Sequence, residues 1–325
     1  MAALVPLPAE AVVAFVPDLP VDVVVPADRT PEAAREAVAD ADLLLADWTS
    51  QLLVDGLLLA AAPHLAFVQQ PSVGVEHIDL DACAAAGVPV ANTAGANAVS
   101  VAEWCVMAAL TVSRSAVWAD GQVRAGGWPQ LELAERGCVE VAGRRVGIVG
   151  FGPIGAAAAS RFAALGCPVS YWSRRRRSPE ESAGATYAEL DDLLASSDIL
   201  VVVVALAPET TGLLGAGQLR RLPQGAVVVN AARGGVVDET ALVELLDAGH
   251  LAGAGLDVYA TEPLAADSPL RSHDRVLLSP HVAGATLQSR MRILLAVTAN
   301  LRRAVGGEAV EDVRNGVDPV VRRRR

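Results

Sequence analysis

The chain has 325 residues, of which 52% are hydrophobic and 19% are charged, and its formal net charge is −11. This length and composition predict a globular protein with two ordinary domains, and they exclude a disordered chain. The acidic balance argues against a general nucleic-acid-binding protein, because such proteins usually carry a net basic domain.

The chain also lacks sequence signals for membranes and metals. Its longest apolar run, 199–208, is far shorter than the ~20 residues that a membrane-spanning helix needs, and no basic region precedes the first apolar residues as in a secretory signal. All 26 basic residues are Arg, which excludes a Schiff-base or phosphate-loop lysine. We expect a cytoplasmic protein with no membrane, nucleic-acid or metal partner, and buried thiols at four dispersed cysteines: Cys83, Cys105, Cys138 and Cys167.

Short runs rich in Val and Leu alternate with helical stretches in the first hundred residues. This rhythm indicates parallel strands joined by crossover helices. We expect helices at Glu32–Ala39, Ser50–Ala61 and Leu80–Ala86. The expected strands are Val12–Val16, Val21–Val25, Leu43–Ala46, Leu65–Gln69 and Val88–Asn92.

A helix-compatible segment, 96–128, is too long for a simple connection and leads to a second α/β series. In that series we expect helices at Ile154–Leu165, Ala188–Ala195 and Glu239–Ala248. The expected strands, including a continuous Val-rich run typical of a strand buried on both faces, are Val146–Val149, Val169–Trp172, Ile199–Leu206, Ala226–Asn230, Gly253–Leu256 and Val276–Leu278.

After the last strand an amphipathic helix at 287–305 has no strand to follow it, so we expect it to pack back on the first domain. The predicted fold class is therefore α/β, with two doubly wound parallel-sheet domains. Residues 98–285 would form a Rossmann cofactor domain. Residues 1–97 and 286–325 would form a discontinuous, flavodoxin-like substrate domain.

A glycine-rich turn follows the strand at 146–149 with the order G-x-G-x-x-G: Gly150, Gly152 and Gly155. In such a turn the first glycine permits a tight bend, the second lets the backbone approach a pyrophosphate, and the third lets helix and strand pack closely. Pro153 suits the first helical position and Ile154 follows it, so free amides at this helix start would face an anion. The turn predicts a dinucleotide site, with a tight turn that binds no ligand as the alternative.

Four consecutive arginines stand out in this acidic chain directly after the strand at 169–172. About 20 residues after the glycine turn of a dinucleotide site, an acid usually binds the ribose hydroxyls of NAD. Here the strand ends in Ser173, Arg174 and Arg175, and a hydroxyl followed by guanidinium groups would instead bind a 2′-phosphate. We therefore expect NADP(H) in preference to NAD(H), with a solvated turn as the alternative.

Three polar side chains lie at or just beyond the C-terminal ends of predicted strands, where ligands bind in open α/β sheets. They are Arg233 in NAARGG, Glu262 in ATEP and His281 in SPHVAG. Arg233 can clamp a carboxylate and its neighbouring carbonyl with a planar fork. His281 can exchange a proton with a substrate oxygen, while Glu262 would favour the imidazolium and hold the ring.

The order of FGPIG, NAARGG, DVYATEP and SPHVAG resembles the D-isomer-specific 2-hydroxyacid dehydrogenase family, and the likeness covers nearly the whole chain. It implies NAD(P)H-dependent reduction of a 2-keto acid to the D-2-hydroxy acid, with Arg233, Glu262 and His281 as the catalytic residues. It also implies that Val73 and Gly74 hold the substrate carboxylate through their backbone, whereas Asn97 either approaches the substrate or caps a loop. The implied cofactor contacts are Ala231, Ala232, Asp257 on the nicotinamide side, and Gly284.

The loop PSVGVEHID resembles that of glyoxylate and hydroxypyruvate reductases, so we expect a small 2-keto acid as substrate. Phosphoglycerate dehydrogenases tend to carry an extra basic residue in this loop, where the chain has Ser72 and Val73. Two alternatives remain open: an NAD-linked dehydrogenase for a larger 2-keto acid, and a dinucleotide-sensing binding protein like the C-terminal-binding co-repressors. The long helical connection resembles the family's dimerisation arm, which predicts a homodimer.

Overall fold

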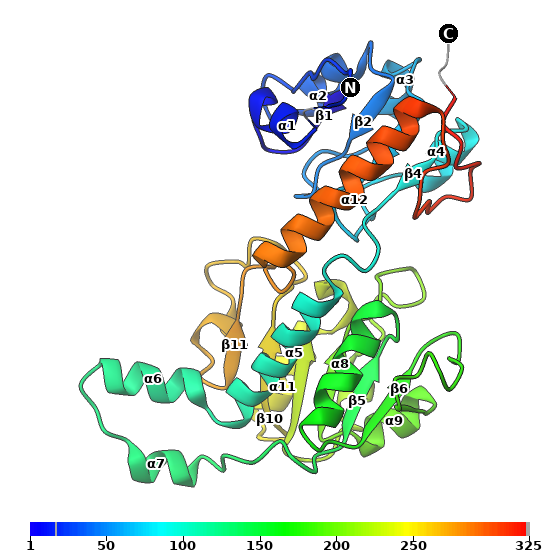
Figure 1. Cartoon of the computed structure of the whole chain (residues 1–325). Coiled ribbons are helices and arrows are strands. Elements are labelled where there is room, and N and C mark those ends of the chain that lie inside the picture. The colour runs from blue at the N-terminus through cyan, green and yellow to red at the C-terminus, as the bar shows by residue number, and fades with distance from the viewer. Residues whose placement is uncertain (17, 323–325) are drawn as a thin grey trace. The chain divides into compact units, whose positions relative to one another are not determined.

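The computed structural model describes residues 1–16 and 18–322 and divides the chain into two compact units. Unit 1 comprises Met1–Asn97 and Leu287–Arg325, and unit 2 comprises Ala98–Thr286. The first and last parts of the chain, blue and red in Figure 1, therefore belong to the same unit. The assignment of one unit to the substrate and the other to the cofactor stays a prediction.

The sheet of unit 1 has four short parallel strands in the order β1-β2-β3-β4. Val24 adds an isolated parallel bridge to Ala2 on the outer edge of β1. If the Val24 segment is counted as the second strand along the chain, then β2, β3 and β4 become the third, fourth and fifth strands. The strand order across the sheet is then 2-1-3-4-5, as in flavodoxin-like sheets. The strands are β1 (Ala2–Ala3), β2 (Leu43–Leu45), β3 (Phe67–Gln69) and β4 (Val90–Ala91).

Both faces of this sheet are buried, as expected of a doubly wound unit. Leu44, Val68 and Val90 belong to the apolar cluster on one face. Their neighbours Phe67 and Ala91 join the cluster on the other face, which contains part of α12 (Leu287–Gly306). Successive side chains of a strand point to opposite faces, so a run of apolar residues is needed to cover both. The other helices of unit 1 are α1 (Ala9–Phe15), α2 (Pro31–Val38), α3 (Gly56–Ala61) and α4 (Leu80–Ala85).

The N-terminal quarter departs most from the sequence-based expectation. The strand expected at Val12–Val16 is wrong, because the first four of these residues lie in helix α1 and Val16 is its C-cap residue. Within the helix Val12 is buried, while Val13 is 46% exposed. The strand expected at Val21–Val25 forms only the bridge at Val24. The helix expected at 50–61 begins at Gly56, because the Asp55 side chain caps it by accepting a hydrogen bond from the amide of Leu58.

Unit 2 contains a seven-stranded parallel sheet in the order β11-β10-β9-β8-β5-β6-β7. The chain order reverses between β5 and β8, which is the topological switch point of a Rossmann sheet. The two α/β sheets confirm the predicted fold class. The strands are β5 (Val146–Val149), β6 (Val169–Trp172), β7 (Thr186–Tyr187), β8 (Ile199–Val202), β9 (Ala226–Asn230), β10 (Leu251–Leu256) and β11 (Val276–Leu278).

Four of these strands have the bounds that the sequence predicts, but three details differ. Strand β10 begins at Leu251, two residues before the expected start. Strand β8 ends at Val202, four residues before the expected end, and β7 was not expected at all. Strand β7 pairs in parallel with β6, with Thr186 opposite Ser170.

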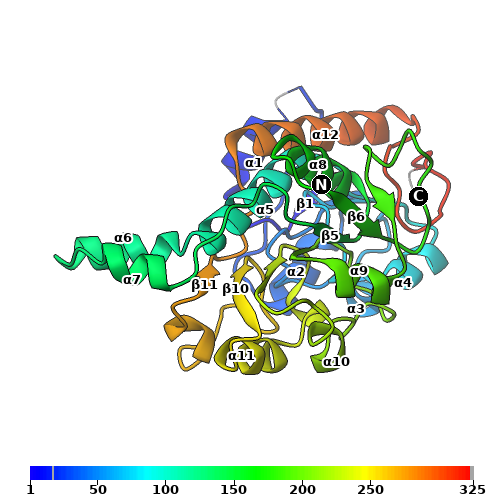
Figure 2. The same cartoon turned by 90° about the horizontal axis from the view of Figure 1, so that it is seen from below.

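Helices cover both faces of the larger sheet. Helix α5 (Ala98–Ser113) packs closely on β10, where a Cβ atom at Gly255 would meet the Ala108 side chain at 2.9 Å. After α5, the helices α6 (Ala116–Arg124) and α7 (Gln130–Glu135) project beyond the sheet and contain no buried residue (Figures 1 and 2). None of the described helices is long and apolar enough to cross a membrane. The remaining helices are α8 (Pro153–Ala164), α9 (Leu190–Ser196), α10 (Ala216–Leu219) and α11 (Glu239–Asp247), with 3₁₀ turns η1 (Gly234–Val236) and η2 (Pro269–Ser272).

Candidate active site

The glycine-rich turn between β5 and α8 has the geometry that a dinucleotide requires. Gly150 has a φ of 98°, and a Cβ atom there would lie 2.6 Å from the backbone of Val204. A Cβ atom at Gly155 would lie 2.4 Å from the carbonyl oxygen of Gly150. At Gly152, in contrast, no atom lies within 4 Å of such a Cβ. The first and third glycines are therefore required by packing, while the second leaves open space in front of the helix.

The start of α8 suits an anion in that open space. Gly152 is the N-cap residue and Pro153 occupies the first helical position, so the amides of the first turn have no partner within the helix. The first turn carries no acidic residue that would compete with a phosphate. The residues present at this turn thus fit the pyrophosphate of a dinucleotide.

The arginine-rich tip after β6 is less uniformly basic than its sequence indicates. Ser173 is partly exposed, and its hydroxyl donates to the carbonyl oxygen of Arg175 at 2.6 Å. The guanidinium of Arg175 pairs with Glu181 at 3.1 Å, and that of Arg174 lies 3.9 Å from Glu209. Two carboxylates therefore share the surface of this tip with the predicted phosphate-binding groups.

Arg177 differs from its neighbours because it faces the glycine turn. Its Nε donates to the carbonyl oxygen of Phe151 at 2.8 Å, and its backbone amide donates to the Tyr171 hydroxyl at 2.9 Å. The rings of Phe151 and Tyr171 stack with centroids 4.0 Å apart. Arg177 thus ties the tip to the loop that would hold the pyrophosphate, and the other three arginines are more exposed.

Arg233 lies in a loop that Asn230 shapes at the end of β9. The Asn230 side chain accepts a hydrogen bond from the amide of Ala232 at 3.1 Å and donates to the carbonyl oxygen of Arg233 at 3.3 Å. The next residue, Gly234, packs so closely that a Cβ atom would lie 1.8 Å from the backbone of Tyr259. This contact places the Arg233 loop directly beside the loop that follows β10.

His281 and Glu262 lie in direct contact, while their predicted acid–base role stays a prediction. His281 Nδ1 lies 2.8 Å from Glu262 Oε2, and the other oxygen of Glu262 accepts a hydrogen bond from the amide of Tyr259 at 3.0 Å. Because Nδ1 donates to the carboxylate, Nε2 is the nitrogen that can exchange a proton with a substrate. The His281 side chain is 46% exposed, so it is accessible.

Asp257 holds the backbone around His281. Its buried carboxylate accepts hydrogen bonds from the Ser279 hydroxyl and from the amides of Val282 and Ala283, at 2.8 and 2.7 Å for the two amides. His281 itself has a φ of 55°, in the left-handed region that costs a non-glycine residue roughly 1–2 kcal/mol. Asp257 thus stabilises the strained backbone conformation of His281, the predicted catalytic residue. Its expected contact with the nicotinamide stays a prediction.

Asn230 and Tyr259 are two residues of this site that the sequence reasoning missed. The buried Tyr259 hydroxyl donates to the carbonyl oxygens of Ser279 at 2.9 Å and Leu256 at 3.1 Å. Tyr259 therefore connects the loops that carry Arg233, Glu262 and His281. The sequence offered only a weak signal, namely an Asn at the end of a strand and a Tyr within DVYATEP.

In unit 1, the predicted carboxylate-binding residues Val73 and Gly74 lie in the partly exposed loop after β3. Ser72 lies in the same loop, and its carbonyl oxygen accepts a hydrogen bond from the amide of Thr93 at 3.2 Å. Asn97 is the last residue of the first segment of this unit. Its buried Oδ1 has no hydrogen-bond partner among the described residues. The roles of Val73, Gly74 and Asn97 stay predictions.

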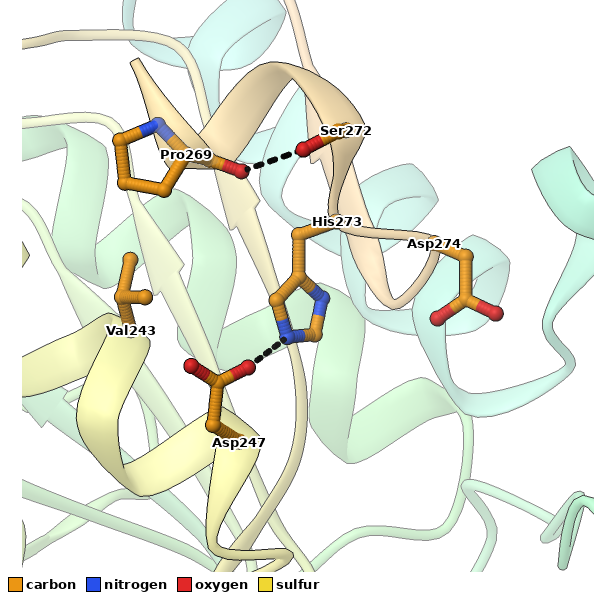
Figure 3. A pocket seen from close by; sticks show the side chains of 6 residues that line it. All are labelled: Val243, Asp247, Pro269, Ser272, His273 and Asp274. Carbon is orange, nitrogen blue, oxygen red and sulfur yellow. Dashed lines mark hydrogen bonds and ion pairs between the residues drawn. The ribbon is translucent and has the colours of Figure 1, made fainter.

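A hollow of about 330 Å³ on unit 2 contains none of the predicted site residues (Figure 3). It lies between α11 and η2, where His273 Nε2 is 3.5 Å from Asp247. It is lined by Val243, Asp247, Pro269, Ser272, His273 and Asp274. We attach no ligand to it, because the loops described above follow the C-terminal ends of the strands, where open α/β sheets bind their ligands.

These features define a dinucleotide-binding α/β protein with a histidine–carboxylate pair. Residues 106–283 match the model of the D-isomer specific 2-hydroxyacid dehydrogenase, NAD binding domain. The chain belongs to the D-isomer specific 2-hydroxyacid dehydrogenase family. The family predicted from the sequence motifs is thereby confirmed.

The chain is similar to several named dehydrogenases and reductases. The chain is 39% identical over 289 residues to the D-3-phosphoglycerate dehydrogenase of Mycobacterium leprae, covering 89% of this chain but only 53% of that protein. It is 37% identical over 290 residues to the glyoxylate reductase of Korarchaeum cryptofilum, with 86% of each chain covered. The crystal structure of a glyoxylate reductase from Paecilomyes thermophila is similar with a TM-score of 0.83 and 28% identity, covering 94% of this chain and 95% of that one. The chain thus spans about half the length of the phosphoglycerate dehydrogenases that it matches.

Proposed function

We propose that the protein reduces a small 2-keto acid, such as glyoxylate or hydroxypyruvate, to the corresponding D-2-hydroxy acid. The observation that carries this proposal is the pair of His281 and Glu262, joined at 2.8 Å in a chain that belongs to this family. Its likeness to glyoxylate reductases over 86% of both chains supports the small substrate.

The residues of the site have separate roles in this reaction. The bound nicotinamide supplies the hydride. His281 donates a proton from Nε2 to the substrate carbonyl oxygen, while Glu262 stabilises the imidazolium and fixes the ring. Arg233 clamps the carboxylate and the polarised carbonyl with its planar guanidinium. In the reverse direction, His281 accepts the proton from the hydroxyl.

The cofactor site consists of the glycine turn and the tip of β6. Gly150, Gly152, Gly155 and the amides at the start of α8 hold the pyrophosphate. Ser173 and Arg174 bind a 2′-phosphate, so NADP(H) is preferred and NAD(H) is the alternative. A 2′-phosphate can compete with Glu209 for Arg174, because their charges are 3.9 Å apart and both side chains are largely exposed.

A second candidate substrate is a phosphorylated 2-hydroxy acid, because the chain is 39% identical to a D-3-phosphoglycerate dehydrogenase. The loop at 70–76 contains no Arg, which favours an unphosphorylated substrate.

The decisive experiment is a spectrophotometric screen of NADPH and NADH against glyoxylate, hydroxypyruvate, pyruvate and phosphohydroxypyruvate. We expect the highest kcat/KM for a small unphosphorylated 2-keto acid with NADPH. Oxidation of neither cofactor by any 2-keto acid, with cofactor binding intact, would instead favour the dinucleotide-sensing alternative.

The proposal includes a homodimer in the cytoplasm. Helices α6 and α7 and the turn between them present Val117, Val123, Trp128 and Leu131 to solvent, and Trp128 is 81% exposed. An apolar surface of this kind is typical of a protein–protein contact. The four cysteines are free thiols, which supports a reducing compartment.

A further inference from the structure

We propose that Gln70, Asn92 and Ser72 are positioning residues that turn two peptide groups of the loop at 72–75 toward a carboxylate, beside a third peptide group that the backbone amide of Thr93 holds. This inference rests on the proposed function, because it concerns the loop expected to bind the substrate carboxylate. It assigns roles to side chains that neither the sequence motifs nor the relatives single out.

Two carbonyl oxygens of this loop accept hydrogen bonds from the segment that follows β4, and a third accepts one from a hydroxyl of the loop itself. Val73 O accepts a hydrogen bond from Asn92 Nδ2 at 2.7 Å, and Ser72 O accepts one from the amide of Thr93 at 3.2 Å. Gly74 O accepts one from the Ser72 hydroxyl at 3.3 Å. Three successive carbonyl groups thus have partners inside the protein.

The direction of these carbonyl groups determines the direction of the amides. In a planar trans peptide, the C=O and N–H bonds point in opposite directions. The amides of Val73, Gly74 and Val75 are therefore turned away from the interior, and none of them donates to any described residue. All three residues are partly exposed. Successive free amides form a concave site for an anion, and a carboxylate fits it.

The buried amide side chains keep this arrangement rigid. Gln70 has no exposed surface, and its Nε2 donates to Ser72 Oγ at 2.6 Å. Because that hydroxyl in turn donates to Gly74 O, it must accept from Gln70, which sets the orientation of the Gln70 amide. Asn92 is 3% exposed and holds the next peptide group. Its position at the end of β4 is set by the ladder of the sheet.

The neutral charge of the supporting side chains affects which anionic substrates the loop can bind. Gln70 and Asn92 are neutral, so the positive potential at the loop comes from peptide dipoles alone. A site of this kind binds one carboxylate and adds no cation for a second anionic group. The geometry therefore favours a substrate with a single carboxylate close to its keto group over a phosphorylated one.

The test compares Asn92→Asp with a matched control, Asn315→Asp, in the full chain. The carboxylate introduced by Asn92→Asp cannot donate to Val73 O, and it places a negative charge beside the loop. Asn315 is also a partly buried amide that is hydrogen-bonded to the β4 segment, but at the start of that strand. It donates to Val88 O and accepts a hydrogen bond from the amide of Val90. The readouts are KM and kcat for glyoxylate, the Kd of oxalate for the enzyme–NADPH complex, and the Kd of NADPH.

We expect Asn92→Asp to raise KM and the oxalate Kd by about tenfold or more, which corresponds to the loss of one hydrogen bond to a charged group. The NADPH Kd should stay within about twofold of the wild-type value, and kcat should change less than KM. Ser72→Ala removes a partly exposed hydroxyl together with the hydrogen bonds that it makes to Gln70 and Gly74, and it should raise the oxalate Kd by about threefold to tenfold.

Wild-type carboxylate affinity in both Asn92→Asp and Ser72→Ala would overturn the inference. An equal loss in Asn315→Asp would also overturn it, because the effect would then reflect general destabilisation of unit 1. If the wild type binds oxalate and Asn92→Asp does not, while no 2-keto acid is reduced, the anion site stands and the proposed function fails. Absence of oxalate binding to the wild type contradicts the anion site itself.

Discussion

At His281, the backbone conformation and the side-chain contact are set by two different carboxylates. Asp257 holds the amides that follow His281, and Glu262 holds Nδ1 of the ring. Because both carboxylates follow β10, the position of the imidazole depends on one strand and the loop beyond it. Preorganisation of this kind lets a proton donor meet the substrate without a change of rotamer.

The first prediction concerns His281→Ala. This variant should bind NADPH with wild-type affinity, because the pyrophosphate turn is on a different loop. Its kcat should fall by about 10²–10⁴, the usual contribution of a general acid. Steady-state kinetics and a fluorescence titration of NADPH measure the two effects, and a near-normal kcat would exclude His281 as the acid.

The second prediction concerns Tyr259, because burial raises its pKa to about 12. In the unfolded chain a tyrosine has a pKa near 10, so between pH 10 and 12 the unfolded state loses this proton first. The stability that Tyr259 contributes is thus complete below about pH 10 and is lost as the pH rises through about 12. The free energy of unfolding should fall over this interval by up to about 3 kcal/mol from this group.

Tyr259→Phe isolates this contribution. It should lower the stability near neutral pH by about 1 kcal/mol, through the lost hydrogen bond to Ser279 O. It should also flatten the alkaline decline relative to the wild type, as measured by urea denaturation at several pH values. The chain contains no Lys, so fewer other groups titrate in this interval. If the free energy of unfolding fell equally with pH in the wild type and in Tyr259→Phe, the alkaline decline could not be assigned to Tyr259.

At the scale of secondary structure elements, the glycine turn and the arginine-rich tip work as one unit. Arg177 connects them through Phe151 O, whereas the guanidinium of Arg174 lies near Glu209 on the surface. A tip that is tied to the turn keeps its distance from the pyrophosphate site constant. This distance must match the separation of the pyrophosphate from the adenosine ribose in the cofactor.

The third prediction follows from that difference between the two arginines. Arg174→Ala should raise the KM of NADPH by about tenfold and leave the KM of NADH unchanged, because the proposed role of its guanidinium in cofactor binding is to hold the 2′-phosphate, which NADH lacks. Arg177→Ala should weaken both cofactors by similar factors, because it loosens the turn that they share. Kinetics with both reduced cofactors on both variants separate these outcomes. Equal effects of Arg174→Ala on NADPH and NADH would contradict the NADP(H) assignment.

At the scale of the whole molecule, helices α6 and α7 differ from the other described helices because their residues are not buried in a core of the same chain. They extend away from the sheet of unit 2 (Figure 2). They contain no buried residue, yet they carry large apolar side chains. An amphipathic helix is normally stabilised by burying its apolar face. We therefore expect a second copy of the chain to cover this surface.

The fourth prediction tests that surface with the double variant Trp128→Ser, Leu131→Ser. The wild type should have the mass of a dimer in light scattering, and the double variant should dissociate at a concentration at least about tenfold higher, because it loses two large apolar contacts. Leu57→Ser, at a residue of unit 1 that is 67% exposed, is the control and should stay dimeric. A monomeric wild type would exclude the homodimer.

Local sequence determined those parts of the fold in which one periodicity dominates. Strands β5, β6, β9 and β11 have their predicted bounds, because runs of β-branched and apolar residues between turns favour strands buried on both faces. The apolar run at 12–16 was ambiguous, since five residues fit either a strand or one face of a short helix. It forms helix α1, in which the tertiary packing buries Val12.

The sequence by itself also determined the family and predicted the types of the candidate functional side chains, because the glycine turn and the three loop motifs are local and have fixed spacing. Only the tertiary structure decided which residues support them. Asn230, Tyr259, Gln70 and Asn92 act through hydrogen bonds to loops at the ends of strands, several of them remote in the chain. Such bonds depend on which strand ends are neighbours and on the direction of single peptide groups, and no local pattern encodes either property.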